Sequence, residues 1–446
     1  MAARGTAVAT VNYEAAYAAA AHANTAIPAF ARKYGLACSA CHTVWPELNA
    51  FGQAFKDRGY QLGNERDSPI YQNGSYWPMA MRITPGFHYE STTNQVVDAV
   101  PGDGTSGTAE RTLNQSGMDL SGIDFLALGT LYRNITFGLV PTLDPDGTMG
   151  IETAFVRFDN LGNSPWANLK VGKFELDNLL SEKRIVTLSN NGGLYQSYHF
   201  LPYGDMNDFG LGDNQLGAEL MGHSANSYTR YSVAVLSSTD GEPGLGAGSS
   251  YDAAFTVSEA TAVNSLGLAR LGLYAYVGQR PTVFQTVGGE PVPGIGQDKK
   301  SFYRIGFTGN FSLGSLELLP FFLHGSDDKA LAGGPQNATW NAALLEGHYF
   351  VSHQFALIGR YEMVRMSQQS DPATPKTLGN VDAITLGFRA YPIMFSRDGL
   401  AIHGEYSLTK TIGMAPLSGD GTGGDPLTPG TSVKSSSLLL ALDFAF

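Results

Sequence analysis

The chain has 446 residues, of which 15% are charged, and a formal net charge of −12. The acidic balance and the lack of a long Lys/Arg cluster argue against nucleic-acid binding. No run of about 18 apolar residues occurs, so no transmembrane helix is expected. Low charge, 54 glycines and 21 tyrosines are typical of a transmembrane β-barrel. A large soluble β-sandwich or propeller is the alternative at this point.

Residues 1–23 predict an atypical signal peptide. Arg4 supplies the basic end, an alanine-rich run covers 15–21, and Ala21-His22-Ala23 fits a cleavage site. The polar residues 12–14 interrupt the apolar region, so either the signal or the start codon is irregular.

The two cysteines of the chain lie in the sequence Cys38-Ser39-Ala40-Cys41-His42. This is the attachment motif of c-type haem, in which both thiols bind the haem vinyl groups and the histidine ligates the iron. A zinc site would need a second cysteine pair, which the chain lacks. A thioredoxin-like redox pair would need a βαβ context, which the sequence does not show. The motif therefore predicts one covalent haem c, and with it export from the cytoplasm.

Residues 24–75 are predicted to form a short α-helical segment around this motif. Pro46 is expected to open a helix, with Phe51 and Phe55 on its apolar face and Gly59 at its end. We expect Phe51, Phe55 and Trp45 to contact the haem, although an ordinary hydrophobic helix face explains the same stripe. So short a segment cannot enclose a haem alone. It is therefore expected to sit in or against the mouth of a barrel.

Residues 76–446 predict a barrel of about 16 antiparallel strands. The connection 176–208 is expected to fold inward as a loop. The predicted strands are Met79–Glu90, Asp119–Leu131, Arg133–Pro141, Met149–Asp159, Leu169–Phe174, Gln215–His223, Thr229–Ser237, Tyr251–Ser258, Leu266–Gly278, Phe302–Phe311, Ser315–His324, Trp340–Phe350, Gln354–Met366, Asp382–Tyr391, Leu400–Thr409 and Ser437–Phe446.

The last strand favours a membrane barrel over a soluble sheet. Leu438, Leu440, Leu442 and Phe444 share one face, and such an apolar terminal edge would promote aggregation in water. A terminal strand that ends in Phe446 resembles the closing strand of bacterial outer-membrane barrels. We therefore predict a location in the bacterial outer membrane.

Alternation assigns the faces of the strands, because charges at mid-membrane must avoid lipid. In the first strand Met79 and Met81 share the lipid face, whereas Arg82 and His88 share the opposite face. A selective or electron-relaying interior and an ordinary hydrated porin wall both fit this pattern. The charges predicted to face the lumen from later strands are Arg270, Arg304, Arg360, Glu362, Arg389, His403 and Glu405.

A further resemblance is carried by Ile27-Pro28-Ala29-Phe30-Ala31-Arg32-Lys33-Tyr34-Gly35, the Cys38–His42 motif, Pro46-Glu47-Leu48-Asn49, Phe51-Gly52-Gln53-Ala54-Phe55-Lys56 and Gly59-Tyr60. This stretch resembles the fused monohaem cytochrome–porins, whose best-known members are outer-membrane iron oxidases of iron-oxidising bacteria. The resemblance implies that Cys38 and Cys41 bind haem and that His42 ligates the iron. It also implies electron transfer from an extracellular donor such as Fe(II) to a periplasmic cytochrome c or another soluble carrier.

Several points stay open in the sequence. Met79, Met81 and His88 are candidates for the distal iron ligand, although parity points both methionines toward lipid. If the protein is an enzyme, the resemblance implies an Fe(II):cytochrome c oxidoreductase. The alternative function is a solute-transport porin whose haem segment is a plug or redox gate. A haem-based sensor is the third possibility, without a visible signalling domain.

Overall fold

The structure is a computed structural model, and it describes residues 29–34, 36, 38–62, 79–100, 108–144, 146–177, 195–205, 207, 209–212, 214–239, 241, 250–263, 267–287, 290–394, 399–412 and 432–445. The predicted signal peptide 1–23, the predicted segment start 24–28 and the connection 63–78 lie outside the described residues. No helix within the described ranges is both long and apolar enough to cross a membrane.

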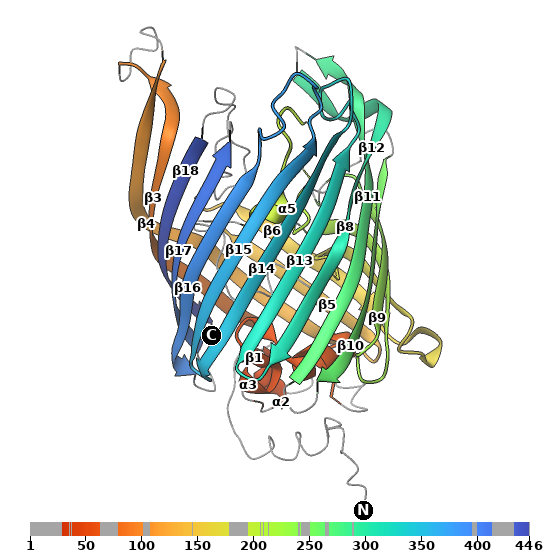
Figure 1. Cartoon of the computed structure of the whole chain (residues 1–446). Coiled ribbons are helices and arrows are strands. Elements are labelled where there is room, and N and C mark those ends of the chain that lie inside the picture. The colour runs from red at the N-terminus through yellow and green to blue at the C-terminus, as the bar shows by residue number, and fades with distance from the viewer. Residues whose placement is uncertain are drawn as a thin grey trace, which may run out of the picture.

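Sixteen antiparallel strands close into one barrel, as predicted (Figure 1). Each predicted strand corresponds to one observed strand. The strands are β3 (Met79–Asp98), β4 (Thr108–Tyr132), β5 (Ile135–Leu143), β6 (Met149–Phe158), β7 (Asn168–Phe174), β8 (Gln215–His223), β9 (Arg230–Ser237), β10 (Tyr251–Val263), β11 (Gly267–Val287), β12 (Glu290–Leu313), β13 (Leu316–Asp327), β14 (Ala338–Ser352), β15 (Phe355–Gln368), β16 (Val381–Met394), β17 (Gly399–Ile412) and β18 (Ser432–Ala445). A short 3-10 turn, η1 (Leu161–Asn163), lies between β6 and β7.

Some strands are longer than the alternation predicts. The predicted strand Met79–Glu90 continues to Asp98, and its partner starts at Thr108 rather than Asp119. Residues 110–118 of β4 are exposed on both faces. A strand without a buried face has no hydrophobic alternation, so the pattern gives no signal there. β11 also extends beyond its predicted end, to Val287, and β12 begins before its predicted start, at Glu290.

The last strand closes the barrel on the first. β18 pairs with β3 in antiparallel register, with Leu440 opposite Phe87 and Phe444 opposite Ile83. Leu440 and Leu442 point outward and are about half exposed, whereas Asp443 is fully buried on the inner face. The prediction of an apolar, outward-facing closing strand is therefore confirmed for the described residues 437–445.

The inner wall carries the charged side chains. Of the lumen charges predicted from the later strands, all but Arg270 are buried, and Arg270 is half-buried against Ser258 and the 227–228 carbonyls. The outer wall is apolar, as a membrane barrel requires. Its most exposed side chains include Leu271, Leu273, Val235, Leu345 and Leu386.

The two ends of the barrel differ in the length of their connections. At one end, Arg133 and Asn134 join β4 to β5, and Gly314 and Ser315 join β12 to β13. We call this the short-turn end. At the opposite end, residues 328–337 and 369–380 make longer connections between strands. The C-terminal strand ends at the short-turn end (Figure 1).

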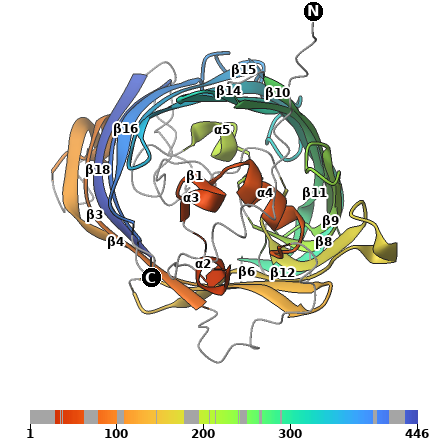
Figure 2. The same cartoon turned by 90° about the horizontal axis from the view of Figure 1, so that it is seen from below.

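Residues 29–34, 36 and 38–62 lie within the short-turn end of the barrel; we call them the N-terminal segment (Figure 2). It contains α2 (Ala29–Tyr34), α3 (Cys38–Cys41), a small hairpin of β1 (His42–Val44) and β2 (Glu47–Leu48), and α4 (Ala50–Asp57). The expected placement in the barrel mouth agrees with this arrangement.

The predicted helix start at Pro46 is wrong. Trp45 and Pro46 form the turn of the β1–β2 hairpin, and the helix begins only at Ala50. Asn49 is the N-cap, because its side chain accepts a hydrogen bond from the Gly52 amide. Gly59 follows the helix at a φ of +78°, where glycine avoids the strain of a side chain. The segment is thus less helical than its sequence predicts.

Candidate functional site

Cys38 and Cys41 begin and end the single turn of α3. Positions three apart lie on one face of a helix, so both thiols can reach the same group. Neither cysteine is in a disulfide. Burial raises the pKa of Cys38 and raises that of Cys41 to about 12. A reactive redox pair lowers a thiol pKa instead, so this environment disfavours the thioredoxin-like alternative.

His42 follows Cys41 directly and is oriented by two backbone carbonyl oxygens. Its Nδ1 lies 3.0 Å from the Pro46 oxygen and 3.3 Å from the Glu47 oxygen. Burial lowers the pKa of this imidazole, which favours the neutral form. With the ring hydrogen on Nδ1 donated to Pro46, the lone pair is on Nε2. This is the form in which histidine ligates a metal.

The β1–β2 hairpin and Asn49 hold the cysteine turn against α4. The Asn49 amide nitrogen donates to the Cys41 oxygen at 2.9 Å, and its side chain donates to the Ala40 oxygen at 3.1 Å. Gly52 permits this close approach, because a Cβ there would lie 2.1 Å from the Cys41 oxygen. Asn49 therefore fixes the C-terminal half of the motif, at Ala40 and Cys41.

The predicted haem-contact residues separate into two groups. Phe55 is buried in a small core of the N-terminal segment, and Phe51 packs against the edge of that core. Phe30 and Tyr34 make edge-to-face contacts with Phe55 at ring distances of 5.2 and 5.7 Å. The apolar residues of α4 thus form part of the hydrophobic core of the segment. This agrees with the alternative interpretation of the sequence, an ordinary hydrophobic helix face.

Trp45 lies in the second group, against the barrel wall. Its ring lies under the guanidinium groups of Arg82 and Arg389, at 5.2 and 5.3 Å from the ring centre. The hydroxyl of Tyr391 donates to the Trp45 carbonyl oxygen. Val44 packs beside it on β15 to β17. The observed role of Trp45 is to attach the hairpin to the wall.

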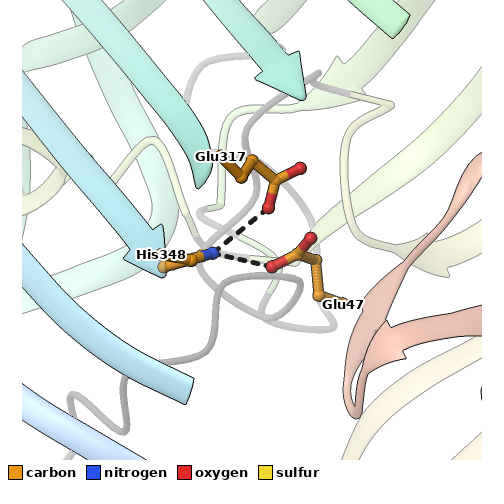
Figure 3. A group of neighbouring side chains, drawn as sticks. All are labelled: Glu47, Glu317 and His348. Carbon is orange, nitrogen blue, oxygen red and sulfur yellow. Dashed lines mark hydrogen bonds and ion pairs between the residues drawn. The ribbon is translucent and has the colours of Figure 1, made fainter. Parts of the chain in front are cut away.

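Sequence reasoning did not anticipate the charged contacts between the segment and the wall. Glu47, Glu317 and His348 converge from β2, β13 and β14 (Figure 3). His348 Nδ1 lies 2.8 Å from Glu47 Oε2 and 3.2 Å from Glu317 Oε2. These three residues form what we call the acid–histidine cluster. Burial, and then the adjacent Glu317, raise the pKa of Glu47 well above its usual range.

A second charged contact lies across the lumen. The carboxylate of Asp57 is 3.0 Å from Arg230 of β9, whose guanidinium also binds Asp177. Arg157 of β6 donates to the backbone oxygens of Lys56 and Asp57. The C-terminal end of α4 therefore receives two arginines, which suits the negative end of a helix dipole. No local sequence pattern signals such pairs, because the partners are about 100 or more residues apart.

The distal-ligand candidates lie on β3. Ala80 and Arg82 face inward, so the alternation places Met79 and Met81 on the outer face. This orientation, already expected from the sequence, argues against both methionines as iron ligands. His88 lies on the inner face further along the strand. Its Nε2 is buried and has no hydrogen-bond partner within the described residues. Of the three candidates, only His88 points toward the lumen.

The predicted inward loop 176–208 is confirmed in its described residues 195–205 and 207. It carries the single-turn helix α5 (Gln196–His199) and packs against the inner wall (Figure 2). The Tyr195 hydroxyl donates to Glu346 Oε2 at 2.9 Å, and Ser197 donates to Glu362 through its amide and hydroxyl. The guanidinium of Arg360 lies 3.7 Å from the centre of the Tyr195 ring. Among the described residues, the N-terminal segment and this loop therefore both lie in the lumen.

Comparisons with known proteins give a likeness of fold. No protein-family model matches the chain, and no curated protein matches it. The anion-selective porin from Comamonas acidovorans is similar over 82% of this chain and 99% of its own, at 12% identity and a TM-score of 0.53. OmpT of Vibrio cholerae in its trimer form covers the same shares at 11% identity and a TM-score of 0.48. The DcaP channel of Acinetobacter baumannii covers 82% and 97% at 13% identity and a TM-score of 0.45.

The protein is a porin-like β-barrel of the bacterial outer membrane. Its sixteen antiparallel strands close on themselves, its outer wall is apolar, and the Comamonas porin shares the fold. Barrels of this kind have short turns on the periplasmic side and longer loops outside the cell. The short-turn end, with the N-terminal segment inside it, therefore faces the periplasm.

Proposed function

We propose that the barrel is an outer-membrane electron-transfer protein with one haem c bound at Cys38, Cys41 and His42. The observation that carries the proposal is the geometry of this motif. Two thiols that form no disulfide lie on one helical turn, and the next residue is a histidine whose Nδ1 is hydrogen-bonded to the Pro46 oxygen. We further propose that the chain is a member of the fused monohaem cytochrome–porins, on the resemblance of residues 27–60.

The residues present fit a haem and have separate tasks in holding it. Each thiol would add across one vinyl group, with its hydrogen passing to the other vinyl carbon. His42 would offer Nε2 to the iron, while the bond from Nδ1 to Pro46 fixes the plane of its ring. Trp45 and Val44 fasten the hairpin to the wall. Haem supplies one-electron exchange at a potential set by its ligands and surroundings.

The position of the motif suggests where partners bind. One haem cannot bridge a hydrocarbon layer of about 30 Å. A periplasmic cytochrome c or another soluble carrier would therefore collect the electron at the short-turn end. The donor would enter from the extracellular side, and Fe(II) is the donor that the family resemblance suggests. The corresponding enzyme activity would be Fe(II):cytochrome c oxidoreductase.

Two measurements test this proposal: haem retention on a denaturing gel, and visible spectroscopy of the haem. The full chain, produced with a haem-attachment system and purified in detergent, should retain one haem on a denaturing gel. The variants Cys38→Ser and Cys41→Ser should weaken that attachment, and the double variant should abolish it. Anaerobic addition of Fe(II) to the oxidised protein should produce the reduced haem bands. A chain without covalent haem would overturn the proposal, whereas reduction by dithionite but not Fe(II) would remove only iron as the donor.

A solute porin with the haem segment as a plug is the second candidate. The porin-like fold favours it, together with the charged contacts that tie both internal segments to the wall. Liposomes that contain the barrel should then leak small solutes when the contacts of the N-terminal segment are removed by Asp57→Ala with Glu47→Ala. Unchanged, low leakage in that variant would count against a removable plug.

A further inference from the structure

We propose that Glu47, Glu317 and His348 bind a divalent transition-metal cation where the N-terminal segment meets the barrel wall. The three side chains come from three different elements and point toward one another (Figure 3). One ligand atom from each residue lies within 4.8 Å of the others. The three ligating side chains are not those of the haem motif, although the Glu47 backbone oxygen lies 3.3 Å from His42 Nδ1, and the proposal does not depend on electron transfer.

The charge of the acid–histidine cluster favours a bound cation. Glu47 and Glu317 are each 4% exposed, and His348 is fully buried. Two carboxylates therefore face one imidazole, which can supply at most one positive charge. Beside one imidazole, two buried carboxyl groups keep the charge balanced either by holding a proton or by binding a cation, and a cation would displace that proton. Because a divalent cation neutralises both carboxylates, it meets this need with the histidine neutral.

The cluster also has unused ligand capacity. Glu47 Oε1 is buried and has no hydrogen-bond partner in the described part of the chain. A buried carboxylate oxygen normally accepts at least one hydrogen bond. Glu47 is 96% buried and directed into the cluster, so its free lone pairs point to a missing ligand. A cation bound by Glu47 would satisfy them.

The environment of His348 matches that of a metal-ligating histidine. Its Nδ1 faces Glu47 and Glu317, while its Nε2 lies 2.6 Å from Glu346 Oε1. Ligating histidines commonly donate the second ring hydrogen to a carboxylate, which fixes the tautomer and raises the basicity of the ligand. The Tyr195 hydroxyl in turn holds the other oxygen of Glu346. The ligand and its support are thus both in place.

One imidazole and two carboxylates select the class of cation. Carboxylates alone suit Mg²⁺ and Ca²⁺, whereas an imidazole shifts the preference to Zn²⁺ and neighbouring first-row metals. Metal–ligand bonds of about 2.0–2.2 Å place the ligand atoms of a tetrahedral site a little over 3 Å apart. The observed separations of 2.8 and 3.2 Å require only small side-chain movements. A water molecule would complete the coordination.

Zinc binding to the intact protein tests the proposal. The full chain with its haem segment is stripped with a chelator, titrated with ZnCl₂ in detergent, and analysed for bound zinc after gel filtration. We expect one zinc per chain, and X-ray absorption at the zinc edge should show one imidazole among oxygen ligands. His348→Gln and Glu317→Gln should each weaken binding by at least 100-fold. Glu346→Gln should weaken it by about 10–100-fold, as removal of a supporting carboxylate does.

The matched control is His403→Gln. His403 is also buried, and its Nε2 lies 2.9 Å from Glu405 Oε2, but it belongs to no group of three potential ligands in the described residues. This variant should bind zinc as the wild type does. No stoichiometric zinc in the wild type, or unchanged affinity in both ligand variants, would overturn the proposal.

The absorption spectrum keeps the test valid even if a variant fails to fold, because it needs only the wild type. A sulfur ligand at about 2.3 Å would mean that zinc occupies Cys38 and Cys41. That result would overturn the metal site and would also show that these thiols carry no haem. Oxygen and imidazole ligands in a protein without haem would support the metal site while the proposed function failed.

Discussion

Glu47 and His348 join the N-terminal segment to the barrel wall, with Glu47 Oε2 lying 2.8 Å from His348 Nδ1. The two residues are about 300 positions apart in the chain. His348 also contacts Glu346 through its other nitrogen, and Glu346 accepts from Tyr195 of the inner loop. A continuous series of buried polar contacts therefore links the N-terminal segment, the wall and the inner loop.

Replacing His348 with alanine should loosen the N-terminal segment. The change leaves Glu47, Glu317 and Glu346 buried together without the imidazole, and removing one partner of a buried ion pair costs about 3–5 kcal/mol. We expect faster protease cleavage within residues 29–62, read by mass spectrometry. His324→Ala is the control, because His324 lies on β13 and bonds Asn341 instead of the segment. Equal cleavage rates in both variants would contradict this role of His348.

Gly52→Ala should impair the proposed haem attachment by displacing the cysteine turn. The new Cβ would lie 2.1 Å from the Cys41 oxygen, so α4 and α3 must move apart. Such overpacking typically costs about 1–3 kcal/mol. The fraction of chains with covalent haem should fall, as measured by haem staining against total protein. Ala50→Ser, at an exposed position of the same helix, should leave that fraction unchanged.

Asp443→Ala should destabilise the closure of the barrel. Asp443 is fully buried on β18 and binds both Arg82 of β3 and Arg389 of β16. Without it, Arg389 and Arg82 each lose a buried carboxylate partner, while Arg82 keeps Asp124 at 3.7 Å, for an expected cost of about 3–5 kcal/mol. The variant should unfold at lower temperature in a heat-dependent gel-migration assay. Leu442→Ala, which changes the lipid face of the same strand, should lower the midpoint much less, because it breaks no ion pair.

Asp205→Asn should remove a pH dependence of stability. Burial, and then the charge of Asp327, raise the pKa of Asp205 to about 9. Between its ordinary value of 3.8 and this value, the folded protein holds a proton that the unfolded chain lacks. Raising the pH through this range therefore lowers the free energy of unfolding.

The asparagine variant cannot ionise, so its advantage over the wild type should grow with pH. We expect nearly equal melting temperatures near pH 4 and the largest difference near pH 9. The measurement is thermal unfolding of both proteins in detergent across this range. Parallel pH profiles would show that Asp205 does not titrate as its surroundings require.

The barrel was predictable because a membrane imposes a strict rule on each strand. Outward residues must be apolar, so β18 alternates Leu440 and Leu442 with Ala441 and Asp443. The rule gives no signal for residues 110–118 of β4, because these residues are exposed on both faces. The start of β4 at Thr108, instead of Asp119, was therefore not predicted. The separate helix prediction was wrong at Pro46, where a capping Asn49 and a hairpin turn outweigh the helical spacing of the apolar residues.

The site was only partly predictable. Cys38, Cys41 and His42 are adjacent in the chain, so their chemistry is visible as a motif. Trp45 and Phe55 were expected to share one role, but the fold places one against the wall and the other in the segment core. Local spacing does not reveal which of two surfaces an aromatic side chain will contact.

The sequence alone determined the number and faces of the strands and the adjacency of the cysteine–histidine motif. These features are local, since they depend on a period of two residues or on direct neighbours. Only the tertiary structure decided that Glu47 meets Glu317 and His348, and that Asp57 meets Arg230. Those contacts require barrel closure around the N-terminal segment, because closure brings residues far apart in the chain into one buried, low-dielectric space.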